Sequence, residues 1–223
     1  ARPRAMDHNF WLERWQKADI GFHQATAHDF LARHWPALGV ASGAEVLVPL
    51  CGKSNDMVWL AEHGHRVIGT ELAQTAIDQF FADRTRTPAS VMENGFNVSR
   101  AGPYELLCGD HLKLDPAFTR RIGGVFDRAA LVALPRVLQQ PYAEKLADLT
   151  PSGVPVLLIT LDYDPSQMEG PPFPIPADRV EQLFGRDFRI TLLENRDGLA
   201  ASQNLKNRGL SSLVETAWKL VRR

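Results

Sequence analysis

The stretch Val46-Leu47-Val48-Pro49-Leu50-Cys51-Gly52-Lys53-Ser54 decides the fold class. It begins as a short apolar strand, turns sharply at a small residue, and ends at a serine, a residue type that often begins a helix. A helix that begins directly after such a turn presents free backbone N–H groups to a ligand. The segment therefore predicts a strand, a ligand-binding turn and a helix, in that order.

The same alternation continues along the chain. Helices over 54–63 and 74–83 flank a strand over 66–70, which predicts a βαβ unit with a right-handed crossover. The most apolar run, 156–161, should lie in the middle of the sheet. The other expected elements are strands over 104–108, 124–127, 188–194 and 212–220, a hairpin at Asn94-Gly95, and helices over 141–149 and 177–184. The last two strands are joined by few residues and should be antiparallel.

The whole pattern predicts a Rossmann-like α/β fold with a seven-stranded, mostly parallel sheet, one antiparallel strand, and helices on both faces. Residues 6–40 read as two helices that precede the sheet, and residues 44–223 read as the Rossmann-like core of a single domain. We expect Met6 to be the natural first residue, so that residues 1–5 are either foreign to the natural protein or disordered.

The composition fits one soluble globular domain. The 223 residues include 25 basic and 26 acidic ones, which give a formal net charge of -1. A near-neutral chain with dispersed basic residues lacks the excess expected of a protein that coats nucleic acid. The longest apolar run, 154–161, is far too short to span a membrane, and the N-terminus lacks the apolar segment of a secretory signal. We therefore expect a cytoplasmic monomer that binds neither nucleic acid nor a membrane.

Two cysteines, Cys51 and Cys108, are too few for a disulfide framework or a cysteine metal site. The histidines show no metal-ligand spacing, and we read His63 and His65 as surface residues around a turn. We therefore expect no metal. Cys51 beside Lys53 resembles a reactive nucleophile, but a small residue that fills the turn is the favoured interpretation.

Polar residues stand where the predicted strands end, and open parallel sheets bind ligands at the carboxyl ends of their strands. Glu71 ends the second strand, 20 positions after Cys51, where an acid can accept hydrogen bonds from both ribose hydroxyls of a nucleoside. Asp110 ends the third strand and can accept from an adenine amino group. Asp127 and Arg128 end the fourth, although a local ion pair between them is the simpler interpretation of those two residues alone.

The glycine pattern distinguishes a nucleoside site from two kinds of phosphate site. A dinucleotide fold needs the three glycines of G-x-G-x-x-G, whereas this turn has Gly52 alone. Gly52-Lys53-Ser54 matches the end of a Walker P-loop, but the first glycine of that motif is absent. A nucleoside without a pyrophosphate fits such a turn better.

A series of motifs runs in order over almost the whole chain. They are Phe10-Trp11-x-x-Arg14-Trp15, Ile20-Gly21-Phe22-His23, Val48-Pro49-Leu50-Cys51-Gly52-Lys53-Ser54, Val67-Ile68-Gly69-Thr70-Glu71-Leu72, Cys108-Gly109-Asp110, Asp127-Arg128-Ala129-Ala130-Leu131, Leu158-Ile159-Thr160-Leu161-Asp162-Tyr163-Asp164 and Gly170-Pro171-Pro172-Phe173. In these motifs the chain resembles the thiopurine S-methyltransferase family, particularly its bacterial members. The third and the last motif are together highly specific, because neither is general to methyltransferases.

The resemblance implies a class I methyltransferase fold that binds S-adenosylmethionine, with residues 6–40 as a helical lid. The residues that it assigns to the cofactor are Trp11, Leu50, Glu71, Asp110, His111 and Arg128. It places Phe22 and Arg208 at the acceptor. We add Gly52, in the turn, and Trp15, whose ring can face a sulfonium or cover a flat acceptor. Being four residues apart on a helix, Trp11 and Trp15 are more typical of a core stripe when the resemblance is left aside.

The resemblance also implies the reaction, which is methyl transfer from S-adenosylmethionine to the sulfur of a thiopurine or a related aromatic or heterocyclic thiol. A soft sulfur nucleophile needs little general-base help, so such an enzyme works mainly by alignment and by excluding water. We expect Arg128 to be catalytic, because its charge favours the thiolate form of the acceptor. The lid, roughly residues 8–25, should order on cofactor binding, since its aromatic side chains have no other apolar partner.

Two alternatives stay open. The chain could be a related small methyltransferase that acts on halide, selenium or tellurium species, which a panel of acceptors would distinguish. It could instead be a non-catalytic nucleoside-binding or NAD-linked protein. The missing second and third glycines argue against NAD, and competition between S-adenosylhomocysteine and NAD would decide between the two.

Overall fold

The structure is a computed structural model that describes residues 8–18, 21 and 23–223. The expectations for residues 1–5 and for Phe22 fall outside the described residues. The two helices expected before the sheet are present as α1 (His8–Gln16) and α2 (Asp29–His34). No helix in the described part of the chain has the length and apolarity that crossing a membrane requires.

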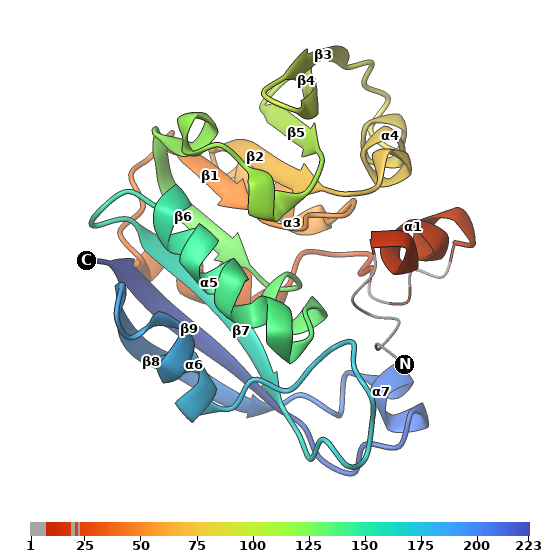
Figure 1. The fold of residues 1–223 in the computed structure, drawn as a ribbon, viewed down its shortest axis with the longest axis vertical. Helices are drawn as coiled ribbons and strands as arrows, with labels where there is room; N and C mark the ends of the chain where they lie inside the picture. The colour runs from red at the N-terminus through yellow and green to blue at the C-terminus, as the bar shows by residue number, and fades with distance from the viewer. Residues whose placement is uncertain (1–7, 19–20, 22) are drawn as a thin grey trace.

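The described chain forms one nine-stranded sheet in the order β3-β4-β5-β2-β1-β6-β7-β9-β8 (Figure 1). The strands are β1 (Glu45–Val48), β2 (Arg66–Glu71), β3 (Ala89–Glu93), β4 (Phe96–Ala101), β5 (Tyr104–Cys108), β6 (Ile122–Asp127), β7 (Pro155–Asp162), β8 (Phe188–Asp197) and β9 (Val214–Arg222). The five central strands, β5, β2, β1, β6 and β7, pair in parallel, as the βαβ pattern predicts. β8 and β9 form the expected antiparallel pair.

The prediction of seven strands with one antiparallel is wrong in its count. The Asn94-Gly95 turn, with φ of 45° and 82°, closes a hairpin whose arms β3 and β4 add two strands to the sheet beyond β5. As a result two strands, β4 and β9, run against the others. The sequence signals the turn, but the alternation of β3 is weak because both of its faces are exposed, with Met92 67% accessible.

Helices cover both faces of the sheet, as expected. They are α3 (Asn55–Glu62), α4 (Gln74–Ala82), α5 (Arg136–Leu149), α6 (Ala177–Phe184) and α7 (Gln203–Asn207), with short 3-10 turns at Trp35–Ala37, His111–Lys113, Pro116–Thr119 and Leu131–Ala133. α5 and α6 pack on one face and lie in front of it in Figure 1, whereas α2, α3 and α4 pack on the other. The helix expected from residue 141 begins at Arg136, so Pro141 lies inside it.

Two apolar clusters hold these layers together. Tyr142 of α5 belongs to the first and is fully buried, and Phe80 of α4 belongs to the second. Helix α1 joins the core through Trp15, which is 3% accessible and packs on Ala73 and Ala76 at the start of α4. The expectation that the lid aromatics have no apolar partner of their own is therefore wrong for Trp15, because the start of α4 provides one.

Candidate functional site

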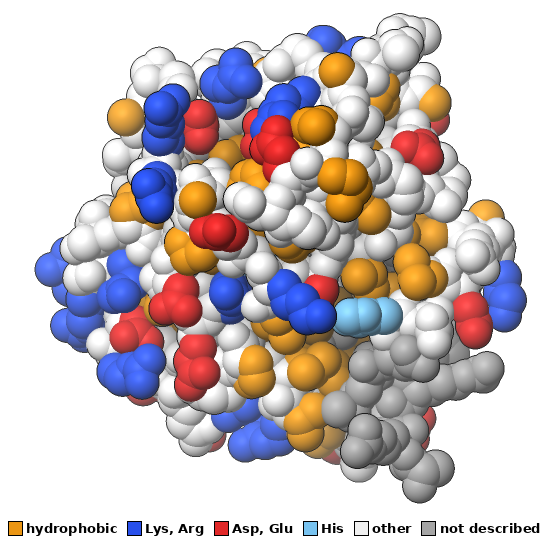
Figure 2. Space-filling model, turned by 45° about the horizontal axis from the view of Figure 1, so that its top comes forward, with side chains coloured by type: hydrophobic (Ala, Val, Ile, Leu, Met, Phe, Trp, Pro, Cys, Tyr) orange, Lys and Arg blue, Asp and Glu red, His pale blue; other side chains and the backbone are white. Residues whose placement is uncertain are grey.

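A cavity of about 680 Å³ lies at the carboxyl ends of the central strands, within the range typical of small-molecule sites. Its walls come from α1, the turn after β1, the ends of β2, β5 and β6, the loop after β7, and α7. The sequence-predicted site residues that line it are Trp11, Trp15, Leu50, Gly52, Glu71, Asp110, His111, Arg128 and Arg208. The face shown in Figure 2 carries basic and acidic side chains interspersed rather than gathered in one basic patch.

The turn after β1 has a backbone that few residues adopt easily. Leu50 and Gly52 have φ of 47° and 53°, a region that favours glycine. The Leu50 N–H donates to Thr70 Oγ1 at 3.2 Å, and the Cys51 N–H donates to the Thr70 carbonyl at 2.8 Å. A Cβ at Gly52 would lie 3.1 Å from the Trp15 ring. Glycine therefore allows both the turn and the close approach of Trp15.

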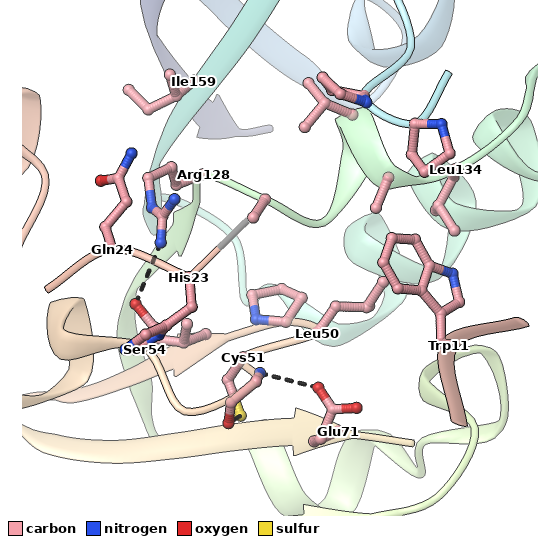
Figure 3. Close-up of a pocket in the computed structure, with 18 of the residues that line it drawn as sticks. Trp11, His23, Gln24, Leu50, Cys51, Ser54, Glu71, Arg128, Leu134 and Ile159 are labelled. Carbon is pink, nitrogen blue, oxygen red and sulfur yellow. Dashed lines mark hydrogen bonds between the residues drawn. The ribbon is translucent and has the colours of Figure 1, made fainter. Parts of the chain in front are cut away.

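The Glu71 carboxylate is buried at the end of β2. Its Oε2 accepts the Gly52 N–H at 2.8 Å (Figure 3). Its Oε1 accepts the Ala73 N–H at 2.9 Å. Burial raises the pKa of this carboxyl, against the opposing effect of the backbone hydrogen bonds. Each carboxylate oxygen has a further lone pair. Glu71 can therefore accept two more hydrogen bonds from a ligand such as a vicinal diol.

His111 is a buried imidazole behind this turn. Its Nδ1 lies 2.8 Å from Thr70 Oγ1. Which of these two atoms donates depends on the tautomer of the ring, because a hydroxyl can accept two hydrogen bonds as well as donate one. Nε2 is buried and has no hydrogen-bond partner among the described residues. Burial, and then the charge of Lys145, lowers the pKa of His111 to about 3, so the ring is neutral at physiological pH.

Asp110 stands beside His111 at the end of β5. It caps the following 3-10 turn by accepting the Leu112 N–H at 3.0 Å. Its second oxygen lies 3.6 Å from His8 Nε2 of α1. The polar groups of the site thus combine two accepting carboxylates, Glu71 and Asp110, with one buried ring nitrogen, His111 Nε2. These are groups that suit the hydroxyls, amino group and ring nitrogens of an adenine nucleoside.

The ion pair of Arg128 differs from the one that the sequence suggests. Arg128 Nε donates to Asp56 Oδ2 at 2.7 Å. Its Nη2 lies 3.4 Å from Ser54 Oγ (Figure 3). Asp127 points elsewhere, because its carboxylate accepts the Tyr142 hydroxyl at 2.5 Å and the N–H groups of Ala130 and Leu131. The local Asp127–Arg128 ion pair is therefore wrong as an interpretation of the two side chains.

Comparison with known proteins bears on what this site does. A family model described as thiopurine S-methyltransferase matches residues 6–223. The thiopurine S-methyltransferase of Methylococcus capsulatus is 44% identical over 96% of this chain and 97% of its own. That of Azotobacter vinelandii is 44% identical over 98% of this chain and all of its own. The chain belongs to the thiopurine S-methyltransferase family. The resemblance in the motifs is thereby confirmed, and the chain is a methyltransferase that uses S-adenosylmethionine.

Solved structures support the fold of this family member. A SAM-dependent methyltransferase from Anabaena variabilis superposes with a TM-score of 0.64 at 12% identity, over the whole of both chains. The 1,6-didemethyltoxoflavin-N1-methyltransferase of Burkholderia thailandensis superposes with a TM-score of 0.62 at 17% identity, over 95% of this chain and 86% of its own. The expected Rossmann-like α/β fold is confirmed.

Arg208 lies at the rim of the cavity. Its Nη1 donates to the Pro171 carbonyl at 2.7 Å and its Nη2 to the Glu169 carbonyl at 2.5 Å. The Tyr163 hydroxyl donates to the Pro172 carbonyl at 2.6 Å. In this family member the proline segment is therefore a fixed wall, and Arg208 is one of the residues that fix it.

The sequence analysis missed several polar residues of the cavity. Asp56 and Thr70 each connect two site elements, and Ser54-x-Asp56 signals no more than a helix start. His23 also lines the cavity, and burial together with Lys53 and Arg128 lowers its pKa. No group of three or more potential metal ligands occurs in the described chain.

The prediction that His63 and His65 are surface residues is right for one of them and wrong for the other. His65 is buried rather than on the surface, because its Nε2 accepts the Trp35 indole N–H at 3.1 Å. His63 is exposed, as expected, and stacks on Trp59.

Cys51 should be unreactive in this family member. Burial, reinforced by the charge of Glu71, raises the pKa of its thiol well above the ordinary value, so it is not a thiolate near neutral pH. We expect iodoacetamide at pH 8 to leave Cys51 unlabelled in the folded protein and to label it after unfolding in urea. Mass spectrometry of the digested protein reads both states. Rapid labelling of native Cys51 would contradict this.

Asp127 should give a distinctive pH dependence. Burial raises its pKa to about 6 from the ordinary 3.8. Between these values the folded state binds a proton that the unfolded state releases, so this group's contribution to stability falls as pH rises from about 4 to 6. Asp127→Asn removes the titration. The difference in the free energy of unfolding, variant minus wild type, should therefore increase by on the order of 2–3 kcal/mol as the pH rises from about 4 to about 6. Urea unfolding at several pH values measures the difference, and a constant difference would refute it.

Proposed function

We propose that this chain transfers the methyl group of S-adenosylmethionine to the sulfur of thiopurines or related aromatic or heterocyclic thiols. The observation that carries the proposal is the cavity at the carboxyl ends of the strands, with Glu71 and Asp110 at one side and Arg128 at the other. The names of its relatives give the class of acceptor. S-adenosylmethionine supplies the electrophilic methyl group, and the chain supplies the binding, alignment and shielding.

The residues divide between the donor and the acceptor. Glu71 would hold the ribose, and Asp110 and His111 would hold the adenine, because these residues supply the carboxylates and the buried, unpartnered ring nitrogen of the cavity. Leu50, Gly52 and Trp11 would complete the donor site. This set fits the donor, since the turn offers close backbone approach and the carboxylates have acceptor capacity left.

Arg128 would act on the acceptor. Its guanidinium lines the cavity opposite Glu71, next to His23 and Gln24 (Figure 3). A cation beside a thiol lowers the thiol's pKa and so raises the fraction of thiolate, the form that attacks the methyl group. Trp15, Phe22 and Arg208 are proposed for the acceptor as well, with Arg208 acting through the proline wall.

The test is a mass-spectrometric assay of methyl transfer from deuterated S-adenosylmethionine to 6-mercaptopurine. We expect S-methylated product that carries the label, and none when selenite, tellurite or iodide replaces the thiol. Labelled product from those species and not from the thiol would favour the related small methyltransferases. Binding of NAD that competes with S-adenosylhomocysteine would favour the NAD-linked alternative.

The lid gives a second expected result. α1 carries Trp11 and Trp15 to the cavity, so a bound donor should bury more of it. Hydrogen exchange of residues 8–16 should slow when S-adenosylhomocysteine is added, while exchange in β7 stays the same. Equal protection of α1 with and without the ligand would count against a lid.

The remaining expectations from the sequence belong to this proposal. Residues 6–40 would be the lid and residues 44–223 the core of one domain. The protein would act as a cytoplasmic monomer that binds a small-molecule thiol rather than nucleic acid or a membrane. Sedimentation at micromolar concentration tests the monomer.

A further inference from the structure

Asp56 is a buried carboxylate, 2% accessible, on the first turn of α3. Its Oδ2 accepts the Arg128 Nε–H at 2.7 Å and the Ser54 hydroxyl at 2.9 Å. Its Oδ1 accepts the His28 backbone N–H at 2.7 Å. Both carboxylate oxygens are thus occupied by donors of the protein, and Asp56 can influence a ligand chiefly through the groups that it holds.

The most consequential of these groups is the Arg128 guanidinium. A guanidinium has five N–H donors in a fixed plane. Nε is bound to Asp56, and Nη2 is within 3.4 Å of Ser54. Nη1 makes no hydrogen bond to any described residue, while the side chain lines the cavity. Because the plane is rigid, fixing the Nε edge on Asp56 determines where the remaining donors point.

The pairing also determines the electrostatic character of Arg128. Both partners are largely buried, with Asp56 3% and Arg128 13% accessible in their side chains. Together they bring no net charge to the cavity wall. The Asp56 carboxylate offsets part of the Arg128 charge, so the effect of Arg128 on a thiolate depends on how close its remaining N–H donors lie as well as on that charge.

The same turn of α3 holds the segment that connects the lid to the core. Asn55 Nδ2 donates to the carbonyls of Gln24 and Ala25, both at 3.0 Å. Asp56 adds the hydrogen bond to His28, four residues after Gln24 along the chain. The Asp56 carboxylate therefore contacts both Arg128 and the lid linker, residues 23–28, which Asn55 also holds.

We propose that Asp56 is a positioning residue for methyl transfer, which aims Arg128 at the acceptor and ties that orientation to the lid linker. The inference rests on the proposed function, since it requires that Arg128 meets the acceptor. A misplacement of about 1 Å in an aligned reaction can cost about 10²-fold in rate. Asp56→Asn keeps the size of the side chain but replaces one accepting oxygen with a donor, so Arg128 and His28 can no longer both be satisfied.

The test is a double-mutant cycle of Asp56→Asn and Arg128→Ala, measured as kcat with 6-mercaptopurine. We expect each single variant to lose at least about tenfold in kcat. The double variant should lose no more than Arg128→Ala alone, because Asp56 acts through Arg128. The KM for S-adenosylmethionine should change less than threefold in Asp56→Asn. Losses that multiply, or an Asp56→Asn variant within twofold of wild type, would overturn the proposal.

Two controls separate positioning from damage to the fold. Asp187→Asn breaks the exposed Arg186–Asp187 ion pair outside the cavity and should leave kcat unchanged. Asp56→Glu keeps the charge but displaces the carboxylate by one methylene, so it should lose less than Asp56→Asn. If thermal unfolding shows that Asp56→Asn does not fold, Asp56→Glu takes its place in the double-mutant cycle.

A binding readout keeps the two proposals distinguishable. If the wild type shows no turnover with 6-mercaptopurine, the proposed function fails. The same double-mutant cycle is then measured for binding, as the Kd of each variant for 6-mercaptopurine, by calorimetry with S-adenosylhomocysteine present. A non-additive cycle in Kd supports the positioning role of Asp56. An additive one, or wild type that does not bind the thiol, overturns it.

Discussion

Replacing Glu71 with alanine should weaken S-adenosylhomocysteine binding by about 100-fold or more. Two ribose hydroxyls would lose a charged acceptor, and hydrogen bonds to a charged group are worth about 1.5–3 kcal/mol each. The substitution also leaves the N–H groups of Gly52 and Ala73 without their partner, so the turn that receives the ligand loses its support. Calorimetric titration of the folded variant measures the change in Kd.

Two variants make this result interpretable. Glu71→Gln keeps one accepting oxygen for the turn and should therefore bind more tightly than Glu71→Ala, though less tightly than wild type. Glu144→Ala removes a glutamate on α5 whose partner is Gln140, away from the cavity, and should bind as wild type does. Wild-type affinity in Glu71→Ala would mean that the ribose is held elsewhere.

Tyr142→Ala should remove much of the stability of the fold. Tyr142 is the largest of the fully buried side chains, and its hydroxyl donates to Asp127 at 2.5 Å. Truncating a buried aromatic residue costs about 3–5 kcal/mol, and leaving Asp127 short of a donor adds about 1–3 kcal/mol. The total is comparable with the 5–15 kcal/mol by which domains are typically stable. Urea unfolding at pH 7 measures it as a fall in the midpoint.

Tyr142→Phe isolates the hydroxyl from the ring. It should cost about 1–3 kcal/mol and raise the pKa of Asp127 further, because the Tyr142 hydrogen bond now lowers it. Tyr163→Phe is the matched control, since its hydroxyl donates to a neutral carbonyl of Pro172 and should cost less. Equal losses in the two variants would show that the charge of Asp127 has no part in the interaction.

The features that could be predicted from the sequence are those encoded by neighbouring residues. The turn around Gly52, the βαβ alternation and the polar ends of β2, β5 and β6 all come from local patterns. They give the fold class and bring Glu71, Asp110 and Arg128 to one cavity. Because parallel strands place their carboxyl ends together, local patterns here have a long-range consequence.

The features that escaped prediction depend on contacts between distant segments. Asp56 and Arg128 are 72 positions apart, and Thr70 and His111 are 41 apart. The residues near each member of such a pair do not reveal its distant partner. For Arg128 the sequence suggested its neighbour Asp127, whereas the structure pairs it with Asp56. The count of strands failed for a related reason, because whether the arms of a hairpin join an existing sheet is decided by pairing with β5.

The contact between Trp15 and the Gly52 turn also gives the protein an optical probe of its own. Of the five tryptophans, Trp11 and Trp15 line the cavity, whereas Trp35 and Trp218 lie in the core and Trp59 stacks on His63. Indole emission depends on how much water surrounds the ring, so movement of α1 will alter the fluorescence of two residues against a background of three that stay fixed. The proposed lid motion can thus be tested by stopped flow, without attaching a dye.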